Sequence, residues 1–166
     1  MSVNFLNEDC QSYTQEVRFG ICDDDNKKPA YIATGPNEKE WIATVVNKQP
    51  KVITFTAIDN CIEILREDGN MESRCDVMMI YENNIIFVEL KDKREDWRTL
   101  GINQIEITLT HFISNHTEYY KSFKKKRAYV ANRKHQISKV ANFELGKRIF
   151  SEYNIRLHLK SEIEII

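Results

Sequence analysis

Two apolar runs separated by a short polar turn constrain the fold of this chain most strongly. The first run extends from Arg74 to Ile80 and the second from Ile85 to Lys91. The residues between them, Tyr81-Glu82-Asn83-Asn84, are typical of a tight turn. We therefore predict a β-hairpin that carries three charged residues at its open end.

The three charged residues are predicted to share one face of the hairpin. Glu89 and Lys91 are two positions apart, so their side chains point to the same side of a strand. A turn at 82–83 places Asp76 opposite Glu89, and a turn at 83–84 places Asp76 opposite Lys91. Either register puts Asp76 on the face that carries the other two. Directly opposed side chains have Cβ atoms about 5 Å apart.

This arrangement suits the binding of a hard cation. Two carboxylates so close together can chelate one divalent ion, with oxygen distances of about 2.1 Å for magnesium. A lysine beside them makes the site suitable for phosphodiester hydrolysis. The simplest alternative is a cross-strand ion pair at the end of a strand, which contributes about 0–1 kcal/mol when exposed. The local pattern favours that alternative, and the surrounding order of elements favours the site.

The composition indicates one globular domain. The chain has 166 residues, of which 42% are hydrophobic and 30% charged, and it contains no repeat or linker. No apolar run approaches about 18 residues, so we expect no membrane span. The net charge of −1 argues against a protein that coats DNA nonspecifically. It does not exclude a nuclease, whose carboxylates offset its basic residues.

The cysteines and the N-terminus favour a cytoplasmic protein. None of the cysteines at 10, 22, 61 and 75 forms a C-x-x-C pair, so a zinc or iron–sulfur knuckle is not expected. Cys61 and Cys75 lie in apolar segments and are predicted to be buried thiols. The N-terminus lacks the pattern of a secretory signal. We therefore expect reduced cysteines and a cytoplasmic location.

Periodicity predicts the remaining elements. Trp41, Ile42, Val45 and Val46 recur at helical spacing, which predicts a helix from about 37 to 49. An apolar stripe from Ile102 to Ile113 predicts a second helix. The expected elements are a hairpin of 14–22 with 30–34, strands at 52–55, 61–65, 128–131 and 155–166, and helices at 37–49, 99–115 and 143–153.

The order helix, strand, strand, strand, helix, strand, with Asp76 followed by Glu89-Leu90-Lys91, resembles the PD-(D/E)XK nuclease superfamily over about residues 37–131. The resemblance implies an α/β fold with a restriction-endonuclease-like αβββαβ core. Its mixed sheet is flanked by helices, and additions at both ends complete a single domain of residues 1–166.

The resemblance also implies a role for each motif residue. Asp76 and Glu89 correspond to the two acidic metal ligands, and Leu90 offers its backbone carbonyl to the metal. Lys91 corresponds to the lysine that positions the attacking water and stabilises charge on the phosphate. The cofactor implied is Mg²⁺ or Mn²⁺. A second metal would need another carboxylate, for which Glu63 is a candidate.

Three features around the motif differ from the family pattern or leave alternatives. Cys75 precedes Asp76 where the family has proline. Gln104 is a candidate catalytic residue, but Thr108 follows it where some branches carry Gln-x-x-x-Tyr. Many members have a glutamate on the first helix. We take Glu40 as this ligand and keep Glu38 as the alternative.

We therefore expect a metal-dependent nuclease, with DNA favoured over RNA, and a homodimer is possible. The alternative is a catalytically inactive nuclease fold that binds nucleic acid or another protein. Basic residues predicted to contact phosphates directly follow the motif or precede the strand at 128–131, although charge runs of this kind are usually solvated surface. They are Lys93, Arg94, Arg98, Lys124, Lys125, Lys126 and Arg127.

Overall fold

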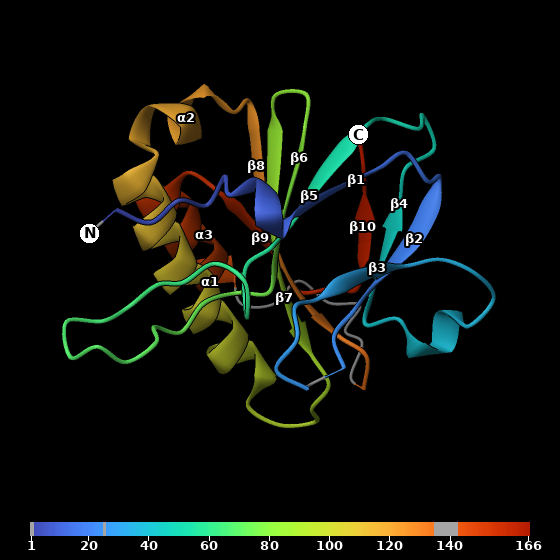
Figure 1. The fold of residues 1–166 in the computed structure, drawn as a ribbon, viewed down its shortest axis with the longest axis horizontal. Helices are drawn as coiled ribbons and strands as arrows, with labels where there is room; N and C mark the ends of the chain where they lie inside the picture. The colour runs from blue at the N-terminus through green and yellow to red at the C-terminus, as the bar shows by residue number, and fades with distance from the viewer. Residues whose placement is uncertain (1, 25, 135–142) are drawn as a thin grey trace.

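The computed structural model describes residues 2–24, 26–134 and 143–166. Within this part, helices and two sheets form three layers, with a six-stranded sheet between the helices and a four-stranded sheet (Figure 1). The elements in chain order are η1 (Glu8–Cys10), β1 (Gln11–Thr14), β2 (Arg18–Cys22), β3 (Tyr31–Ala33), η2 (Glu38–Glu40), β4 (Ala43–Val46), β5 (Ile53–Ala57), β6 (Val77–Tyr81), β7 (Asn84–Lys91), α1 (Trp97–Asn115), α2 (Thr117–Ser122), β8 (Lys125–Asn132), α3 (Phe143–Tyr153), β9 (Arg156–His158) and β10 (Glu162–Glu164).

The six-stranded sheet is mixed, as expected. Its order is β1-β5-β6-β7-β8-β9. The pairs β1–β5, β5–β6 and β6–β7 are antiparallel, whereas β7–β8 and β8–β9 are parallel. The second sheet has the order β10-β4-β2-β3. The predicted α/β class with a mixed sheet is confirmed.

The hairpin register follows the first of the two predicted alternatives. Tyr81 pairs with Asn84 and Val77 pairs with Val88, so Asp76 lies opposite Glu89. The turn is made by residues 82–83, and Glu82 takes a left-handed backbone conformation with φ of 50°.

Strand β7 is buried on both faces because it separates two hydrophobic cores. Ile85 and Phe87 contribute to the core beneath the helices. Ile86 and Val88 contribute to the core between the two sheets. A strand covered on both sides reads as a continuous apolar run, which explains the sequence of the second half of the hairpin.

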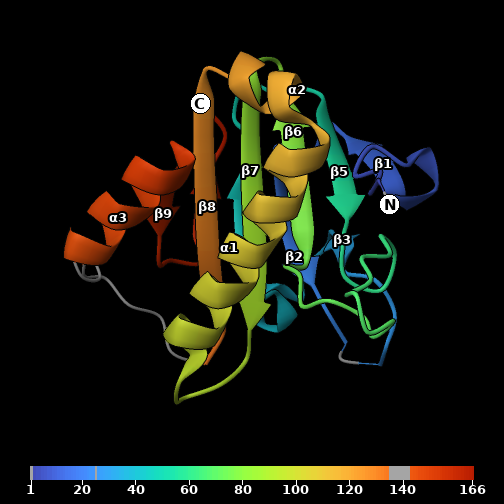
Figure 2. The same ribbon diagram turned by 90° about the vertical axis from the view of Figure 1, so that its left-hand side faces the viewer.

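Helix α1 confirms the helix predicted at 99–115. Its buried stripe, including Ile105, Leu109 and Phe112, faces the six-stranded sheet. Figure 2 shows the three α-helices lying over this face of the sheet. The predicted strand at 128–131 is confirmed within β8, and the predicted helix at 143–153 is confirmed as α3.

The predicted helix at 37–49 is wrong. The structure has the short 3₁₀ helix η2 followed by strand β4. The run Thr44-Val45-Val46 is β-branched and prefers extended backbone. Val45 also pairs with Phe19 on one side and Ile163 on the other. The helix that opens the αβββαβ order is therefore absent here, and the restriction-endonuclease-like core is not confirmed. From β5 onward the order strand, strand, strand, helix, strand is present, with α2 inserted before β8.

The strand predicted at 61–65 is also wrong. The chain between β5 and β6 has only an isolated bridge, from Leu65 to Met71. Cys61 forms a disulfide with Cys10, with Cα atoms 5.9 Å apart. The prediction of a free Cys61 thiol is therefore wrong, because its partner 51 residues away is brought close only by the fold. Cys75 is a free and buried thiol, as predicted.

The two ends of the chain are divided between the sheets. The predicted terminal strand at 155–166 is two short strands, of which β9 joins the first sheet and β10 the second. The predicted N-terminal hairpin is confirmed for β2 and β3, while β1 pairs with β5. No helix among the described residues is long and apolar enough to cross a membrane.

Candidate active site

Asp76 and Glu89 lie side by side beneath α1, at the open end of the hairpin. Asp76 immediately precedes β6 and Glu89 is close to the end of β7. Their exposed fractions are 4% and 2%, so both carboxyl groups are buried. Gly101 of α1 allows the helix to approach closely, because a Cβ atom there would lie 2.5 Å from Val130 and 3.5 Å from Glu89 Cγ.

The ladder between β6 and β7 ends at this point because side chains take over the backbone hydrogen bonds. The Leu90 N–H donates to Asp76 Oδ2 at 2.7 Å. The Cys75 N–H donates to Thr108 Oγ1 of α1, also at 2.7 Å. The N–H and C=O of one residue in an extended strand point to the same neighbour. The Leu90 carbonyl therefore faces the side on which Asp76 lies.

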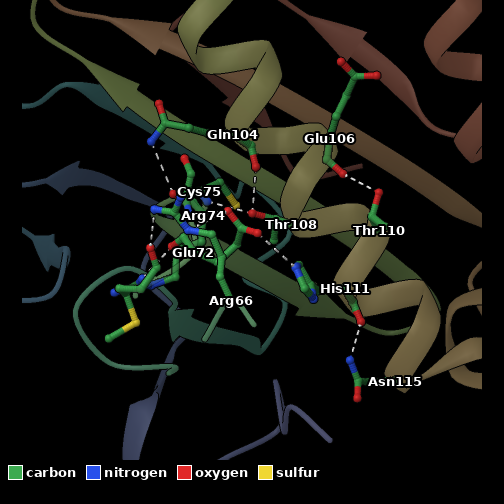
Figure 3. A network of polar contacts seen from close by, with 12 residues as sticks. Arg66, Glu72, Arg74, Cys75, Gln104, Glu106, Thr108, Thr110, His111 and Asn115 are labelled. Atoms are coloured by element: carbon green, nitrogen blue, oxygen red, sulfur yellow. Dashed lines mark hydrogen bonds and ion pairs between the residues drawn. The ribbon is translucent and has the colours of Figure 1, made fainter. Parts of the chain in front are cut away.

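Lys91 connects the carboxylates to α1. Its Nζ lies 3.2 Å from Glu89 Oε1 and also donates to Gln104 Oε1. Gln104 Nε2 in turn donates to the backbone carbonyl of Arg74 at 3.3 Å (Figure 3). Thr108 Oγ1 donates to the Gln104 carbonyl at 2.8 Å. The structure thus brings Gln104 into the group formed by Asp76, Glu89 and Lys91.

Burial makes both carboxyl groups weak acids. It raises the pKa of Asp76 to about 7, although the Leu90 N–H opposes the change. Burial is the largest cause that raises the pKa of Glu89 well above its usual range, and the charge of Asp76 is the second. Lys91 lowers this pKa but does not cancel the increase. Glu89 Oε2 has no hydrogen-bond partner among the described residues. A buried carboxylate oxygen of this kind is stabilised by a cation or a proton.

Three further charged residues, which were not predicted to belong to the site, lie around the pair. Arg74 Nη2 lies 3.2 Å from Asp59 Oδ1. Burial raises the pKa of Asp59, and Arg74 lowers it. The charge of Asp23 raises the pKa of both Asp59 and Asp76. Asp23 belongs to an acidic run visible in the sequence, but its approach to Asp76 depends on the contact between the two sheets.

The donor atoms fit a hard divalent cation. Asp76 and Glu89 offer carboxylate oxygens and Leu90 offers a carbonyl. No group of three or more His, Cys, Asp or Glu side chains suited to a metal occurs in the described part of the chain. Mg²⁺ is commonly held by one or two carboxylates together with waters and substrate phosphates. Glu89 Oε2, which has no hydrogen-bond partner among the described residues, could serve as one of these few protein ligands.

The structure does not bring the predicted first-helix ligand to the pair. Glu40 is exposed at the end of η2, where its backbone carbonyl accepts from Arg133 Nη1 at 2.9 Å. Glu38 forms an ion pair with Arg18 at 2.5 Å. Glu63, the candidate for a second metal, is exposed in the segment between β5 and β6. These positions follow from the strand β4 and the irregular segment that replace the expected helix and strand.

The basic residues that follow the motif remain at this end of the sheet. Lys93, Arg94 and Arg98 are all exposed. The buried Asn132 holds the turn, because its Nδ2 donates to the Lys93 carbonyl at 2.6 Å. The Arg98 guanidinium lies over the Trp97 ring, 5.0 Å from its centroid.

The second basic run lies at the other end of the sheet. Lys125 pairs with Asn84, whereas Asn132 pairs with Lys91. Seven residues of strand separate these pairs, or about 23 Å. Lys126 and Arg127 are buried within the protein, while Lys124 and Lys125 are exposed. The two groups of basic residues predicted to contact phosphates therefore lie at opposite ends of the sheet.

Comparison of the chain with models of protein families, with curated proteins and with solved structures gives no match. The resemblance to PD-(D/E)XK nucleases thus stays a prediction from residues and element order.

Proposed function

We propose that the protein is a metal-dependent nuclease of the PD-(D/E)XK type that hydrolyses phosphodiester bonds, with Mg²⁺ or Mn²⁺ as cofactor. The observation that carries the proposal is the unpartnered, buried Glu89 Oε2 beside Asp76, with Lys91 Nζ 3.2 Å from the other Glu89 oxygen. The family resemblance favours DNA over RNA as substrate.

Asp76, Glu89 and the Leu90 carbonyl would hold the cation. When bound, a divalent cation supplies Lewis-acid activation of a phosphate and lowers the pKa of water. Lys91 would donate a hydrogen bond to the phosphate oxygen on which charge develops, or orient the attacking water. Asp76 accepts the Leu90 N–H, so it fixes the backbone that precedes Lys91.

Gln104 has a positioning role in this proposal. It accepts from Lys91 and is itself fixed through Arg74. The Lys91 ammonium would leave Gln104 when a phosphate oxygen takes its place. Lys93, Arg94 and Arg98 are exposed near the same end of the sheet, where they can contact the phosphates that flank the cleaved bond.

Cleavage of labelled nucleic acid tests the proposal. Single-stranded and double-stranded DNA and RNA are incubated with the protein and Mg²⁺ or Mn²⁺. The variants are Asp76→Asn, Glu89→Gln and Lys91→Ala, and Glu63→Gln is the matched control because Glu63 is an exposed glutamate of the segment between β5 and β6. We expect cleavage by the native protein and by Glu63→Gln, and a loss of at least about 100-fold in the other three.

The result that contradicts the proposal is equal cleavage by all five proteins, which would identify a contaminating nuclease. Absence of cleavage on all four substrates with both cations would also contradict it. A chelator lane shows whether the activity requires a metal. The substrate that is cleaved identifies the nucleic acid class.

A second candidate function is a catalytically inactive module that binds nucleic acid or another protein. The observation that favours it is the closure of the site, since Asp76 and Glu89 are almost fully buried and Lys91 is engaged by Gln104. This alternative predicts salt-dependent binding of nucleic acid without turnover, or co-purification of a protein partner.

The Cys10–Cys61 disulfide bears on the compartment in which this activity operates. We infer a cytoplasmic location from the sequence, but disulfides are rare in reducing compartments and the bond opposes it. Alkylation of free thiols before and after reduction distinguishes a reducing compartment from an oxidising one. The labelled cysteines are identified by mass spectrometry of protein taken from cells. Labelling of Cys10 and Cys61 before reduction would favour the cytoplasm.

A further inference from the structure

A pocket lies at the end of the six-stranded sheet that is distant from Asp76 and Glu89. Its volume is about 530 Å³, and it is lined by residues of α3, β8, β9 and the C-terminal segment. Figure 2 shows β9 and α3 next to β8, and Arg127 of β8 donates to the Glu164 carbonyl near the C-terminus. Among the described residues that line it, Glu164 alone has a carboxylate side chain. The positively charged lining residues are Lys124, Lys125, Lys126, Arg127, Arg156 and Lys160.

The positive charge of this pocket exceeds the negative charge that the described residues place there. None of the six cations forms an ion pair with a carboxylate among the described residues. Arg127 and Arg156 are register neighbours on β8 and β9. Like charges on adjacent strands repel each other, so an anion bound between Arg127 and Arg156 would stabilise the folded state.

Arg127 is built into the wall of the pocket. Its exposed fraction is only 8%. Its guanidinium donates to neutral oxygens alone: Tyr129 Oη at 2.9 Å, the Glu164 carbonyl at 2.8 Å and Tyr81 Oη at 2.8 Å. Its Nε and the buried Nε2 of His158 have no partner among the described residues. The residues that line the pocket therefore include a cation fixed by three hydrogen bonds and two side chains, Arg127 and His158, that each have a buried nitrogen without a partner among the described residues.

Aromatic rings lie next to the cations. Phe150 of α3 lines the pocket and is 45% exposed. The Arg156 guanidinium lies 5.3 Å from its ring centroid. His158 stacks on Tyr129 with ring centroids 4.7 Å apart. A ligand here would meet a planar apolar surface as well as positive charge.

We propose that this pocket binds a nucleoside phosphate, with the phosphate held by Arg127, Arg156 and Lys160 and the base placed against Phe150. Guanidinium groups can form bidentate hydrogen bonds with phosphate oxygens. Bases stack on aromatic side chains without needing a particular sequence. The volume falls within the range of about 300–1,000 Å³ that is usual for small-ligand sites. The ligand is either a free nucleotide or the phosphorylated end of a nucleic-acid strand, which share this chemistry.

Titration with a fluorescent nucleotide, mant-ADP, tests the proposal. The titration contains a chelator, so the result does not depend on cation binding by Asp76 and Glu89 or on cleavage. The variants are Arg156→Gln and Lys160→Gln, both at exposed positions. Lys147→Gln is the matched control, because Lys147 is an exposed lysine of α3 that does not line the pocket. We expect the Kd to rise about tenfold in each pocket variant and to stay unchanged in the control.

Competition identifies the chemistry and the source of the ligand. ADP should displace mant-ADP more effectively than either adenosine or pyrophosphate. An oligonucleotide with a 5′-phosphate that competes better than ADP would support a strand end as the ligand, and the reverse order would support a free nucleotide. Absence of mant-ADP binding, equal weakening by Lys147→Gln, or competition by adenosine as strong as by ADP would overturn the proposal.

Discussion

At the scale of single residues, the buried pair of Asp76 and Glu89 determines what the site can do. The protein places two carboxyl groups where water cannot solvate them, and it provides Lys91 as the neighbouring cation. Removal of one partner from a buried charge pair usually destabilises a protein. Here burial is the largest cause of the raised pKa of Asp76, so neutralisation of this carboxyl group should raise stability at neutral pH and should remove activity.

The pH dependence of stability tests this consequence. The folded pKa of Asp76, about 7, lies above its usual value of 3.8. Its contribution to metal-free stability is therefore fully present below pH 4 and is lost as the pH rises through 7. Each pKa unit corresponds to about 1.4 kcal/mol, so the loss is at most about 4 kcal/mol.

Chemical denaturation of metal-free protein between pH 4 and 8 provides the measurement. We expect the free energy of unfolding of the native protein to fall, relative to that of Asp76→Asn, as the pH rises through this range. Glu63→Gln should follow the native protein. Parallel pH profiles for native protein and Asp76→Asn would mean that Asp76 is not perturbed by its burial.

At the scale of elements, the close contact of α1 with β7 and β8 positions the site. An added Cβ at Gly101 would overlap Val130, whereas at Gly146 of α3 no atom of the described residues lies within 4 Å. We expect Gly101→Ala to lower the free energy of unfolding by about 1–3 kcal/mol through overpacking. The matched Gly146→Ala should raise it by about 0.5–1 kcal/mol, because alanine favours the helix.

Thermal and urea denaturation of both variants provide this comparison. Equal stabilisation by the two substitutions would show that α1 does not approach the sheet at Gly101. Weaker cation binding by Gly101→Ala would show that the helix contact also positions Glu89, whose Cγ atom lies 3.5 Å from an added Cβ.

The sequence predicts those elements whose local preferences agree with their surroundings. The hairpin, α1 and α3 combine clear periodicity with turn or loop residues at their ends, and each is found as expected. The segment 41–46 has a helical spacing of apolar residues. Its β-branched residues and its pairing with two neighbouring strands nevertheless favour the strand β4. Tertiary pairing of this kind cannot be derived from a single sequence.

The residues of the candidate site were likewise predicted correctly only where the elements that carry them were. Asp76, Glu89, Lys91 and Gln104 are brought together because they lie on the hairpin and the helix that were predicted correctly. Glu40 depended on the helix that is absent. The approach of Asp59 to Arg74 arises from irregular segments, for which the sequence provides no periodic signal.

At the scale of the whole molecule, the Cys10–Cys61 disulfide links the N-terminal segment to the chain between β5 and β6. The bond closes a loop of 51 residues. Chain entropy predicts that its loss lowers the free energy of unfolding by about 4 kcal/mol. We expect Cys10→Ser with Cys61→Ser to show this loss in denaturation experiments.

Two controls accompany the disulfide variant. Reductant should destabilise the native protein and leave the double variant unchanged. Cys22→Ala should respond to reductant as the native protein does, because Cys22 is a free thiol. Identical melting of the native protein with and without reductant would contradict the disulfide.

Asp76 and Glu89 together are proposed to bind one divalent cation. Titration of the protein with Mn²⁺ at pH 8, measured by electron paramagnetic resonance of the free ion, tests this binding. We expect one site in the native protein and in Glu63→Gln, and its loss in Asp76→Asn and in Glu89→Gln. Binding should weaken at pH 6, where the carboxyl groups retain protons. Unchanged Mn²⁺ binding in both site variants, or none in the native protein, would contradict the claim.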